Sequence, residues 1–354
     1  MDDVLRFLVN SDVSIRKASK ILSENKLGFC VIVNRNNKVI GVFSDGDYRR
    51  AILNGLELSS SVFEISNMNF LKVEYGYKNN DIKDIFKNSV VTCIPVIKDG
   101  ELVDIIVKDK FIDKNTLFKK QKLENSVVIM AGGKGTRLEP FTKVLPKPLI
   151  PIGDTPIIEL IINEFINYST GDIYITINDK ARMIRAYFSD HHLDGKLNFI
   201  EEDCPLGTAG SLKYLEGMFS KPFFLSNCDV IVKFDYSEVV DFHNDRDNSI
   251  TIIGSMQHHK VPYGICEINN GGGLIKMKEK PEYSFLTNTG VYLINPKVIE
   301  CIPKGVFYDM NSLIDKVQEM GLNVGVFPIS DTSWHDVGEW GEYAKTRRLL
   351  LDNA

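Results

Sequence analysis

The stretch Ala131-Gly132-Gly133-Lys134-Gly135-Thr136-Arg137-Leu138, continued by Pro146-Lys147-Pro148, decides the fold of the larger part of this chain. It follows the short apolar run 127–130, which has the length and β-branched content of a buried parallel strand. Glycines after such a strand allow a tight turn and leave backbone N–H groups open to a phosphate. Arg137 and Lys147 add two positive charges. The stretch therefore predicts a site for nucleotide phosphates.

Two common glycine-loop motifs do not fit this stretch. A Walker P-loop requires Ser or Thr directly after its lysine, but Lys134 is followed by Gly135. A dinucleotide-binding fingerprint requires a third glycine where Leu138 stands, because the helix must pack closely on the strand. Both readings therefore fail on a specific residue.

The spacing of the whole motif resembles the signature of the sugar nucleotidylyltransferases. It reads Gly133-x-Gly135-x-Arg137-x-x-Pro140-x-Thr142-x-x-x-Pro146-Lys147-Pro148. Members of this family join a nucleoside triphosphate to a sugar 1-phosphate and release pyrophosphate. The resemblance implies that Arg137 and Lys147 are catalytic and stabilise the transferred phosphate. It places Gly132, Gly133, Gly135 and Thr136 at the nucleotide.

The rest of this region alternates strand-like and helix-like segments. Apolar runs at 173–177, 222–225 and 250–253 are separated by amphipathic stretches. This alternation predicts an α/β fold with a doubly wound, mostly parallel, Rossmann-like sheet, which binds ligands at the carboxyl ends of its strands. We expect this nucleotidyltransferase domain over residues 126–354, after a polar linker at 119–125.

The first 118 residues contain an internal repeat. Two strand-like runs at 30–33 and 39–43 recur sixty-three residues later at 93–96 and 102–106, each pair preceded by a helical segment. This tandem resembles a pair of CBS modules, an α+β unit that binds adenine nucleotides in many proteins. The resemblance places Ser44 and Asp47 at such a ligand. In the second copy Val107 and Lys110 replace them, so we expect at most one adenine-nucleotide site, with homo-oligomer formation through the CBS pair as an alternative role.

Composition excludes several other classes of protein. The 354 residues carry a formal net charge of −5, which disfavours a nucleic-acid partner. Six scattered cysteines without a CxxC pair favour neither a zinc site nor a disulfide framework, so a reducing cytoplasm is expected. The acidic N-terminus lacks the features of a signal peptide, and no apolar run approaches a membrane span.

Two aspartates are candidates for a Mg²⁺ site. Asp229 follows the strand-like run 222–225 and should lie at the ligand edge of the sheet. Asp336 lies in Trp334-His335-Asp336-Val337-Gly338. The family's two metal carboxylates fall on these positions, and Mg²⁺ prefers carboxylates with water and phosphate. His335 is expected to have a packing role, since histidine suits softer metals.

The resemblance also assigns residues to the sugar phosphate. Lys280, in Glu279-Lys280-Pro281, would hold the phosphate, and Glu279 would accept hydrogen bonds from sugar hydroxyls. Two further segments match the sugar side, Pro262-Tyr263-Gly264 and Asn288-Thr289-Gly290-Val291-Tyr292. These segments add Gly264, Asn288 and Tyr292 to the residues expected at the sugar phosphate.

The base-reading loop of the family falls on Glu202 and on Leu206-Gly207-Thr208-Ala209-Gly210. Guanine offers two adjacent donors that one carboxylate can accept, and Glu202 or its neighbour Glu201 could supply it. Together with the form of the loop, which includes Gly207 and Thr208, this favours GTP. The whole arrangement most resembles the glucosamine-1-phosphate guanylyltransferases of legionaminic acid synthesis. Uridylyl-, thymidylyl-, cytidylyl-, and mannose- or heptose-1-phosphate guanylyltransferases are alternatives, and an inactive nucleotide-sugar-binding regulator is a further one.

Overall fold

A computed structural model describes residues 2–25, 27–78, 82–83, 85–86, 91–108, 123–168, 171–189 and 197–351. The chain divides into two compact units, Met1–Lys120 and Gln121–Ala354. Lys110 and residues 119–122 of the predicted linker lie outside the described residues. No helix in the described ranges is long and apolar enough to cross a membrane.

The first unit contains two three-stranded sheets of the same design. The first has the order β1 (Leu8–Asn10), β2 (Phe29–Val33), β3 (Val39–Ser44), and the second has the order β4 (Val73–Glu74), β5 (Cys93–Lys98), β6 (Glu101–Val107). In each sheet the first pair of strands is parallel and the second pair antiparallel. This matches the repeat that the sequence predicts. The remaining described elements are α1 (Asp2–Leu5), α2 (Ile15–Glu24), α3 (Asp45–Leu53) and η1 (Val62–Ile65).

The two copies pack on one another. Phe29, Val31 and Val42 of the first copy share an apolar cluster with Cys93, and Leu102, Ile105 and Val107 pack against it. The backbone N–H of Val39 also donates to the carbonyl of Gly100 at 2.8 Å. Isolated sheets of this size bury too little apolar surface to be stable. Each copy therefore depends on the other for its core.

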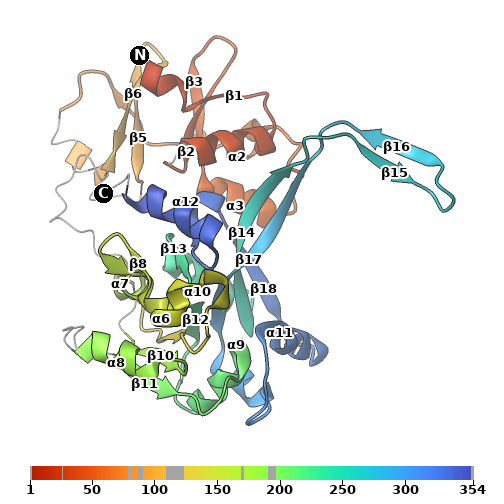
Figure 1. The fold of residues 1–354 in the computed structure, drawn as a ribbon. Coiled ribbons are helices and arrows are strands. Elements are labelled where there is room, and N and C mark those ends of the chain that lie inside the picture. Colours follow the sequence, from red (N-terminus) through yellow and green to blue (C-terminus); the bar gives the residue numbers. More distant parts are fainter. Residues whose placement is uncertain are drawn as a thin grey trace. The chain divides into compact units, whose positions relative to one another are not determined.

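The second unit is built on a seven-stranded sheet (Figure 1). Its order is β11 (Leu197–Glu201), β10 (Ile173–Ile177), β7 (Val127–Met130), β12 (Phe223–Asn227), β17 (Glu282–Ile294), β14 (Ile250–Lys260), β18 (Val324–Ile329). Strand β17 runs antiparallel to both of its neighbours, and the remaining pairs are parallel. The predicted doubly wound, mostly parallel sheet is therefore confirmed.

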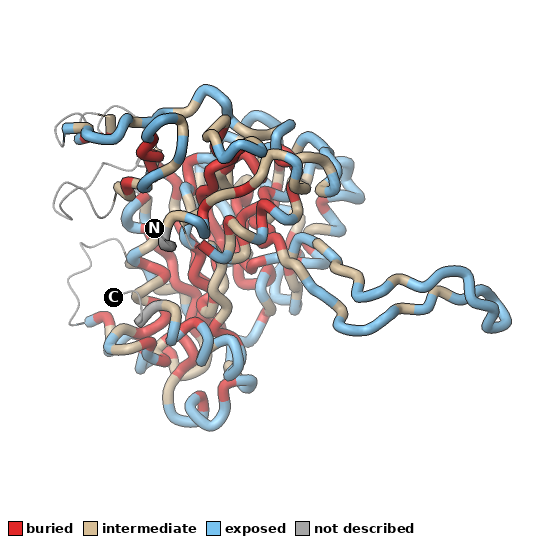
Figure 2. Tube along the Cα trace, turned by 90° about the horizontal axis from the view of Figure 1, so that it is seen from above, coloured by how far each residue is buried: buried red, intermediate tan, exposed pale blue. Residues whose placement is uncertain are grey.

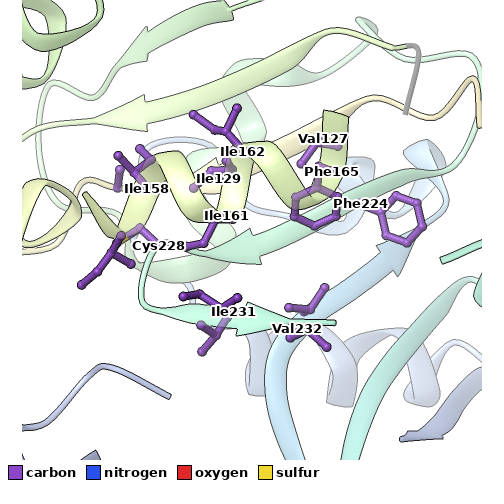
Figure 3. Packing of buried hydrophobic residues seen from close by; sticks show 14 of the residues in the cluster. Val127, Ile129, Ile158, Ile161, Ile162, Phe165, Phe224, Cys228, Ile231 and Val232 are labelled. Atoms are coloured by element: carbon purple, nitrogen blue, oxygen red, sulfur yellow. The ribbon is translucent and has the colours of Figure 1, made fainter. Parts of the chain in front are cut away.

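Apolar side chains alternate between the two faces of this sheet. In β7, Val127 and Ile129 belong to one apolar cluster, and Val128 and Met130 to the other. The first cluster is completed by Ile158, Ile161, Ile162 and Phe165 of α7, as Figure 3 shows. Because successive strand residues point to opposite faces, an all-apolar strand needs cover on both. Helices α7 (Ile157–Ile166), α8 (Ala181–Ser189) and α10 (Tyr236–Asp245) contribute to the first cluster, and α9 (Gly207–Gly210), η4 (Ser211–Leu215), η5 (Pro296–Cys301) and α11 (Met310–Glu319) to the second.

Short elements connect the sheet to the loops at its edge. They are η2 (Thr136–Leu138), α6 (Phe141–Val144), η3 (Lys147–Leu149), β8 (Pro151–Ile152), β9 (Thr155–Pro156), β13 (Val230–Val232), η6 (Asp331–Ser333), β19 (Trp334–Asp336) and α12 (Trp340–Leu351). One further pair, β15 (Ile265–Ile268) and β16 (Leu274–Lys278), forms an antiparallel hairpin beyond the ends of β14 and β17. This hairpin projects from the sheet, and most of its residues are exposed (Figure 2).

Candidate active site

The site lies where the order in which the chain adds strands to the sheet reverses direction. From β7 the chain continues to β10 and β11 on one side, and it then returns to form β12 on the other side of β7. The loops that leave β7 and β12 therefore diverge, and in open α/β sheets ligands bind in the crevice between such loops. The glycine loop follows β7, and Cys228 and Asp229 follow Asn227, the last residue of β12.

The glycines of the loop are needed for different structural reasons. Gly135 has φ +66, and a Cβ there would lie 2.8 Å from the Cβ of Lys147. A Cβ at Gly132 would lie 2.8 Å from Oε1 of Glu202. Both distances are too short for a side chain, so the loop must approach Lys147 and Glu202 as bare backbone. A Cβ at Gly133 would meet nothing within 4 Å, which leaves that position open to a ligand.

Strand pairing brings the two predicted metal carboxylates together. Strands β13 and β19 pair antiparallel with Val230 opposite Asp336, so Asp229 lies beside that pair. The backbone N–H of Val337 donates to the carbonyl of Asp229 at 2.9 Å. A Cβ built on Gly338 would lie 2.9 Å from Oδ2 of Asp229 and also 2.9 Å from Oδ1 of Asp336. The two carboxylates therefore converge on one point, which glycine keeps clear.

Lys147 meets the carboxylates at this point. Its Nζ forms an ion pair with Oδ2 of Asp229, and the two side chains are only 9% and 14% exposed. The same Nζ lies 3.5 Å from the Cβ position at Gly338. Burial, and then the charge of Asp229, raise the pKa of Asp336 despite the hydrogen bond that the Gly338 N–H donates to it at 2.6 Å. One carboxylate is thus neutralised by a lysine, and the other is not paired with one.

This donor set fits Mg²⁺ held partly by a substrate. Mg²⁺ commonly uses one or two carboxylates and completes its shell with phosphate oxygens and water. Among the residues that the structure describes, no group of three or more His, Cys, Asp or Glu could hold a metal without such help. Burial lowers the pKa of His335 to about 4. A neutral, half-buried His335 agrees with the packing role expected for it.

Arg137 lies in η2, at the exposed end of the glycine loop. Its side chain is 65% exposed and forms a 3.0 Å ion pair with Glu339. The next residue, Trp340, donates from Nε1 to the carbonyl of Glu139 at 2.9 Å, and its ring lies edge-on to Phe141 with centroids 4.9 Å apart. We call Glu339 and Trp340 the C-terminal clamp. The clamp ties the glycine loop to the segment that carries Asp336.

Sequence reasoning missed both clamp residues. Their contacts on the loop lie about 200 positions earlier in the chain, at Arg137 and Glu139. The one available signal was their place directly after Asp336-Val337-Gly338. That place puts a bulky aromatic residue at the start of α12 beside the predicted metal ligand.

Glu202 lies beneath the glycine loop and is 6% exposed. Its carboxylate accepts hydrogen bonds from the side chains of Ser211 and Thr176 and from the backbone of Leu206. Burial nevertheless raises its pKa. Glu202 therefore has a structural task in holding the loop, and its reading of guanine stays a prediction. The neighbouring Glu201 is exposed and pairs with Arg185 at 3.1 Å.

Gly207 and Thr208 are held against a distant segment. Gly207 has φ +79, and a Cβ there would lie 2.7 Å from the carbonyl oxygen of Tyr308. The hydroxyl of Thr208 accepts the backbone N–H of Met310 at 3.1 Å. These contacts fix the loop at the start of α11. The predicted contact of Gly207 and Thr208 with the nucleotide stays a prediction.

The predicted sugar-phosphate residues fall into two groups. Asn288 and Tyr292 lie in β17 and are joined by a 2.8 Å hydrogen bond, and a Cβ at the intervening Gly290 would collide with Asn227 at the end of β12. Gly264, Glu279 and Lys280 lie at the base of the projecting hairpin. There a Cβ at Gly264 would lie 3.1 Å from Oε2 of Glu279. The Nζ of Lys280 lies 3.7 Å from Oε1 of the same glutamate.

The two groups are separated along the sheet. Strands β14 and β17 stay paired from Gly254–Asn288 to Lys260–Glu282. At about 3.3 Å per residue, this ladder places the second group roughly 20 Å or more from Asn288. Asn288 and Tyr292 therefore flank the end of β12, whereas Lys280 lies further along the ladder.

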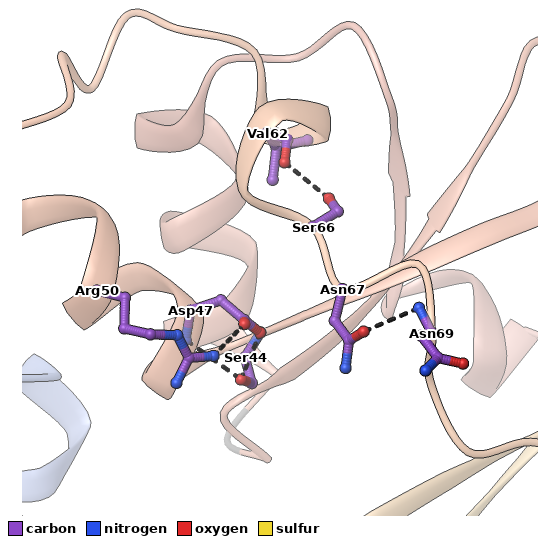
Figure 4. A network of polar contacts seen from close by, with 7 residues as sticks. All are labelled: Ser44, Asp47, Arg50, Val62, Ser66, Asn67 and Asn69. Atoms are coloured by element: carbon purple, nitrogen blue, oxygen red, sulfur yellow. Dashed lines mark hydrogen bonds and ion pairs between the residues drawn. The ribbon is translucent and has the colours of Figure 1, made fainter. Parts of the chain in front are cut away.

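In the first unit, Ser44 and Asp47 form the N-terminal cap of α3 (Figure 4). The Ser44 hydroxyl donates to Oδ2 of Asp47 at 2.6 Å, the Ser44 backbone N–H donates to the same oxygen at 2.9 Å, and Arg50 pairs with Oδ1. This is a capping box, which stabilises a helix without any ligand. The adenine-nucleotide role of these residues stays a prediction.

Comparison with known proteins agrees with this architecture. Residues 126–353 match the family described as nucleotidyl transferase, and residues 4–54 match the CBS domain. A UTP–glucose-1-phosphate uridylyltransferase of Synechocystis sp. is 30% identical over 244 residues, 63% of each chain. A mannose-1-phosphate guanyltransferase of Saccharomyces cerevisiae is 34% identical over 240 residues, 64% of each chain. The chain therefore spans slightly less than two thirds of the length of these relatives.

A solved structure agrees at the level of the fold. The crystal structure of HddC from Yersinia pseudotuberculosis covers 64% of this chain and 99% of its own, with 25% identity and a TM-score of 0.50. Its extent corresponds to one domain of this chain. With a glycine loop on a doubly wound sheet and a family match over more than half its length, this chain belongs to the nucleotidyl transferase family, and it carries an N-terminal CBS domain.

Proposed function

We propose that the chain transfers a nucleoside monophosphate from a nucleoside triphosphate to a sugar 1-phosphate and releases pyrophosphate. The observation that carries this proposal is the convergence of Asp229, Asp336 and Lys147 on Gly338, beside the glycine loop. Two relatives of known name act on sugar 1-phosphates. A dinucleotide oxidoreductase would need none of these three charges.

The reaction brings two anions together, so positive charge must be concentrated at the α-phosphate. Lys147 is held at the carboxylates and can exchange its contact with Asp229 for a phosphate oxygen. Arg137 is exposed at the mouth of the loop and can leave Glu339 for the triphosphate. Positioning and electrostatic stabilisation of this kind supply most of the catalysis in phosphoryl-type transfers.

A divalent ion, generally used by this family, would be held by Asp229 and Asp336 with the substrate phosphates; we propose Mg²⁺. When bound, it supplies Lewis-acid stabilisation of the phosphate charges. The Gly338 N–H orients Asp336 for this task. Asp229, once released from Lys147, would be the second carboxylate that holds the ion.

We further propose GTP as the nucleotide and glucosamine 1-phosphate as the sugar, in the synthesis of nucleotide-activated sugars such as that of legionaminic acid. Support comes from the Leu206-Gly207-Thr208-Ala209-Gly210 loop and from similarity to a guanyltransferase. Similarity to a uridylyltransferase of comparable identity keeps UTP as the second candidate. Mannose 1-phosphate is an equally supported sugar.

The test is a matrix of nucleoside triphosphates against sugar 1-phosphates, scored by pyrophosphate release with Mg²⁺. GTP with glucosamine 1-phosphate should give the largest kcat/KM. Asp336→Asn is the control that should remove activity on every pair. A profile in which UTP exceeds GTP would overturn the base assignment, and a wild-type chain inactive on all pairs would overturn the proposed reaction.

Three proposals concern the rest of the chain. We propose one adenine-nucleotide site at Ser44 and Asp47, association of chains through the CBS pair, and a cytoplasmic location. The packing of the two repeat copies around Phe29 and Cys93 supports a CBS pair as one structural body.

A further inference from the structure

Arg137 and Lys147, the two predicted catalytic cations, each pair with a carboxylate in this chain. Lys147 pairs with Asp229, and both of these side chains are buried or nearly so. Arg137 pairs with Glu339 at 3.0 Å, and both of these side chains are exposed. The reaction proposed above uses Asp229 at the metal, but it gives Glu339 no task of its own.

The backbone is anchored on both sides of the contact between Arg137 and Glu339. Beside Arg137, the backbone N–H of Leu138 donates to the carbonyl of Gly135 at 3.0 Å, and the Leu138 side chain is 1% exposed. The carbonyl of Glu339 accepts the backbone N–H of Tyr343, in the first turn of α12, at 2.8 Å. Rotation of the two side chains is therefore enough to make or break the ion pair.

The ion pair lies next to the proposed metal site along the chain. Glu339 directly follows Gly338, whose Cβ position lies 2.9 Å from carboxylate oxygens of both Asp229 and Asp336. A polyphosphate bound at that point presents several charged oxygens, and a guanidinium binds such oxygens through two parallel hydrogen bonds. The polyphosphate would therefore compete with Glu339 for Arg137.

The exposure of the ion pair decides how readily it can be exchanged. The side chains of Arg137 and Glu339 are 65% and 60% exposed. Ion pairs in such surroundings are weak, because water and salt screen both charges. A pair of this kind gives way to a more highly charged ligand and forms again when that ligand leaves.

We infer that Glu339 is a positioning residue, which holds Arg137 at the mouth of the empty site, yields it to the triphosphate and takes it back as pyrophosphate leaves. The part that concerns pyrophosphate as a product rests on the proposed function. The competition between Glu339 and a polyphosphate for Arg137 does not depend on the sugar.

The competition is tested on the full chain by titration calorimetry with Mg²⁺ and GTP, and separately with Mg²⁺ and inorganic pyrophosphate. Glu339→Gln keeps the shape of the side chain and removes its charge. Both ligands should then bind about two- to five-fold more tightly, since an exposed ion pair no longer has to be broken.

Glu342→Gln is the matched control. Glu342 is an exposed carboxylate in the first turn of α12, and it pairs with Lys345 at 3.4 Å. Its replacement removes the same charge from the same end of the helix, and it should leave the binding of GTP and pyrophosphate unchanged. Equal tightening in Glu342→Gln and Glu339→Gln would mean that any nearby negative charge weakens binding, and it would overturn the inference.

Dependence on Arg137 separates the proposed role from simple repulsion of phosphate by a carboxylate. In an Arg137→Ala background, Glu339→Gln should no longer tighten binding, because no guanidinium is left to compete for. Tightening of the same size with and without Arg137 would show that Glu339 only repels the ligand. That result overturns the inference, as does unchanged or weaker binding in Glu339→Gln with Arg137 intact.

Steady-state kinetics give a second readout that a merely structural role would not move. In Glu339→Gln the KM for the triphosphate should fall by the same factor as the dissociation constant, and inhibition by added pyrophosphate should strengthen. The KM for the sugar 1-phosphate should stay unchanged, and kcat should not rise. An equal change in both KM values would indicate a general change in the site and would count against the role of Glu339.

The failure of this inference can be told from the failure of the proposed function. The wild type could release no pyrophosphate from any pair of substrates while Glu339→Gln still binds added pyrophosphate more tightly only with Arg137 intact. The role of Glu339 then stands, and the proposed function is overturned. If the wild type has the proposed activity but Glu339→Gln binds both ligands as the wild type does, the proposed function stands and the inference is overturned.

Discussion

The two carboxylates at Gly338 should respond to neutralisation in opposite ways. Asp229→Asn removes the partner of Lys147, whose side chain is 9% exposed, and leaves a buried ammonium unpaired. Breaking a buried ion pair from one side costs about 3–5 kcal/mol. At 2–4 °C per kcal/mol for a domain of 150–250 residues, Tm should fall by roughly 6–20 °C.

Asp336→Asn should instead raise stability. Burial and the charge of Asp229 raise the pKa of Asp336, so the folded chain binds this proton more tightly than the unfolded chain. The ionised carboxylate therefore reduces the free energy of unfolding as pH rises above its ordinary value of 3.8, and the loss is complete above the raised pKa. The amide oxygen of Asn can still accept the Gly338 N–H. The gain in Tm should appear at neutral pH and vanish below pH 3.8.

The assay is thermal unfolding followed by circular dichroism or calorimetry, with EDTA present so that no bound metal offsets the repulsion. Both variants should also lose pyrophosphate release with Mg²⁺. A Lys147→Met/Asp229→Asn double variant should recover much of the lost Tm, because the buried ammonium is removed together with its partner. If the two single variants shift Tm in the same direction by similar amounts, the electrostatic account of this site is wrong.

Three further predictions follow from the described contacts. Trp340→Phe keeps an aromatic ring against Phe141 but removes the hydrogen bond to the carbonyl of Glu139. Steady-state kinetics should therefore show a several-fold higher KM for the triphosphate and a smaller change in kcat. Tyr343→Phe, which removes the neighbouring hydrogen bond to the carbonyl of Pro151, is the control. Glu202→Gln can place its amide N–H₂ against the Leu206 backbone N–H, which cannot accept it, at a cost of about 1–3 kcal/mol for the unsatisfied group, so unfolding should show a lower Tm. Loss of GTP preference at an unchanged Tm would indicate base reading as its main role. Asp47→Ala removes half of the capping box of α3 and should lower stability by about 1 kcal/mol, and calorimetry with AMP and ATP should show one site per chain in the wild type and none in the variant; two equivalent sites would refute the assignment.

Several features of the fold could be predicted from short stretches of sequence. An all-apolar run such as Val127–Met130 followed by glycines predicts a buried strand and a loop, because strand period and turn geometry depend on near neighbours. The repeat in the first unit was likewise visible as two pairs of apolar runs, and the two sheets have the same pairing. Asp229 could be placed at the ligand edge because it ends a strand-like run.

Tertiary structure decided which of these residues meet. Lys147 pairs with Asp229 across 82 positions, and Asp336 reaches the same point through the pairing of β19 with β13. Such contacts depend on strand register and on close backbone approach at Gly135 and Gly338, which no local pattern specifies. The clamp on Arg137 and Glu139 arises in the same way.

The order of the motif residues in the sequence also does not decide which of them lie together in the structure. Lys280 follows Asp229 and precedes Asn288 as in the family motif, yet the paired length of β14 and β17 holds it away from Asn288. Ser44 and Asp47 match a ligand motif, but in the structure they cap α3 with their own hydrogen bonds. Sequence by itself thus determined the elements and the types of chemical group, because these depend on local period and turns. Tertiary structure determined which groups share a site, because the register of distant strands and the burial of charges are set only when the whole sheet is assembled.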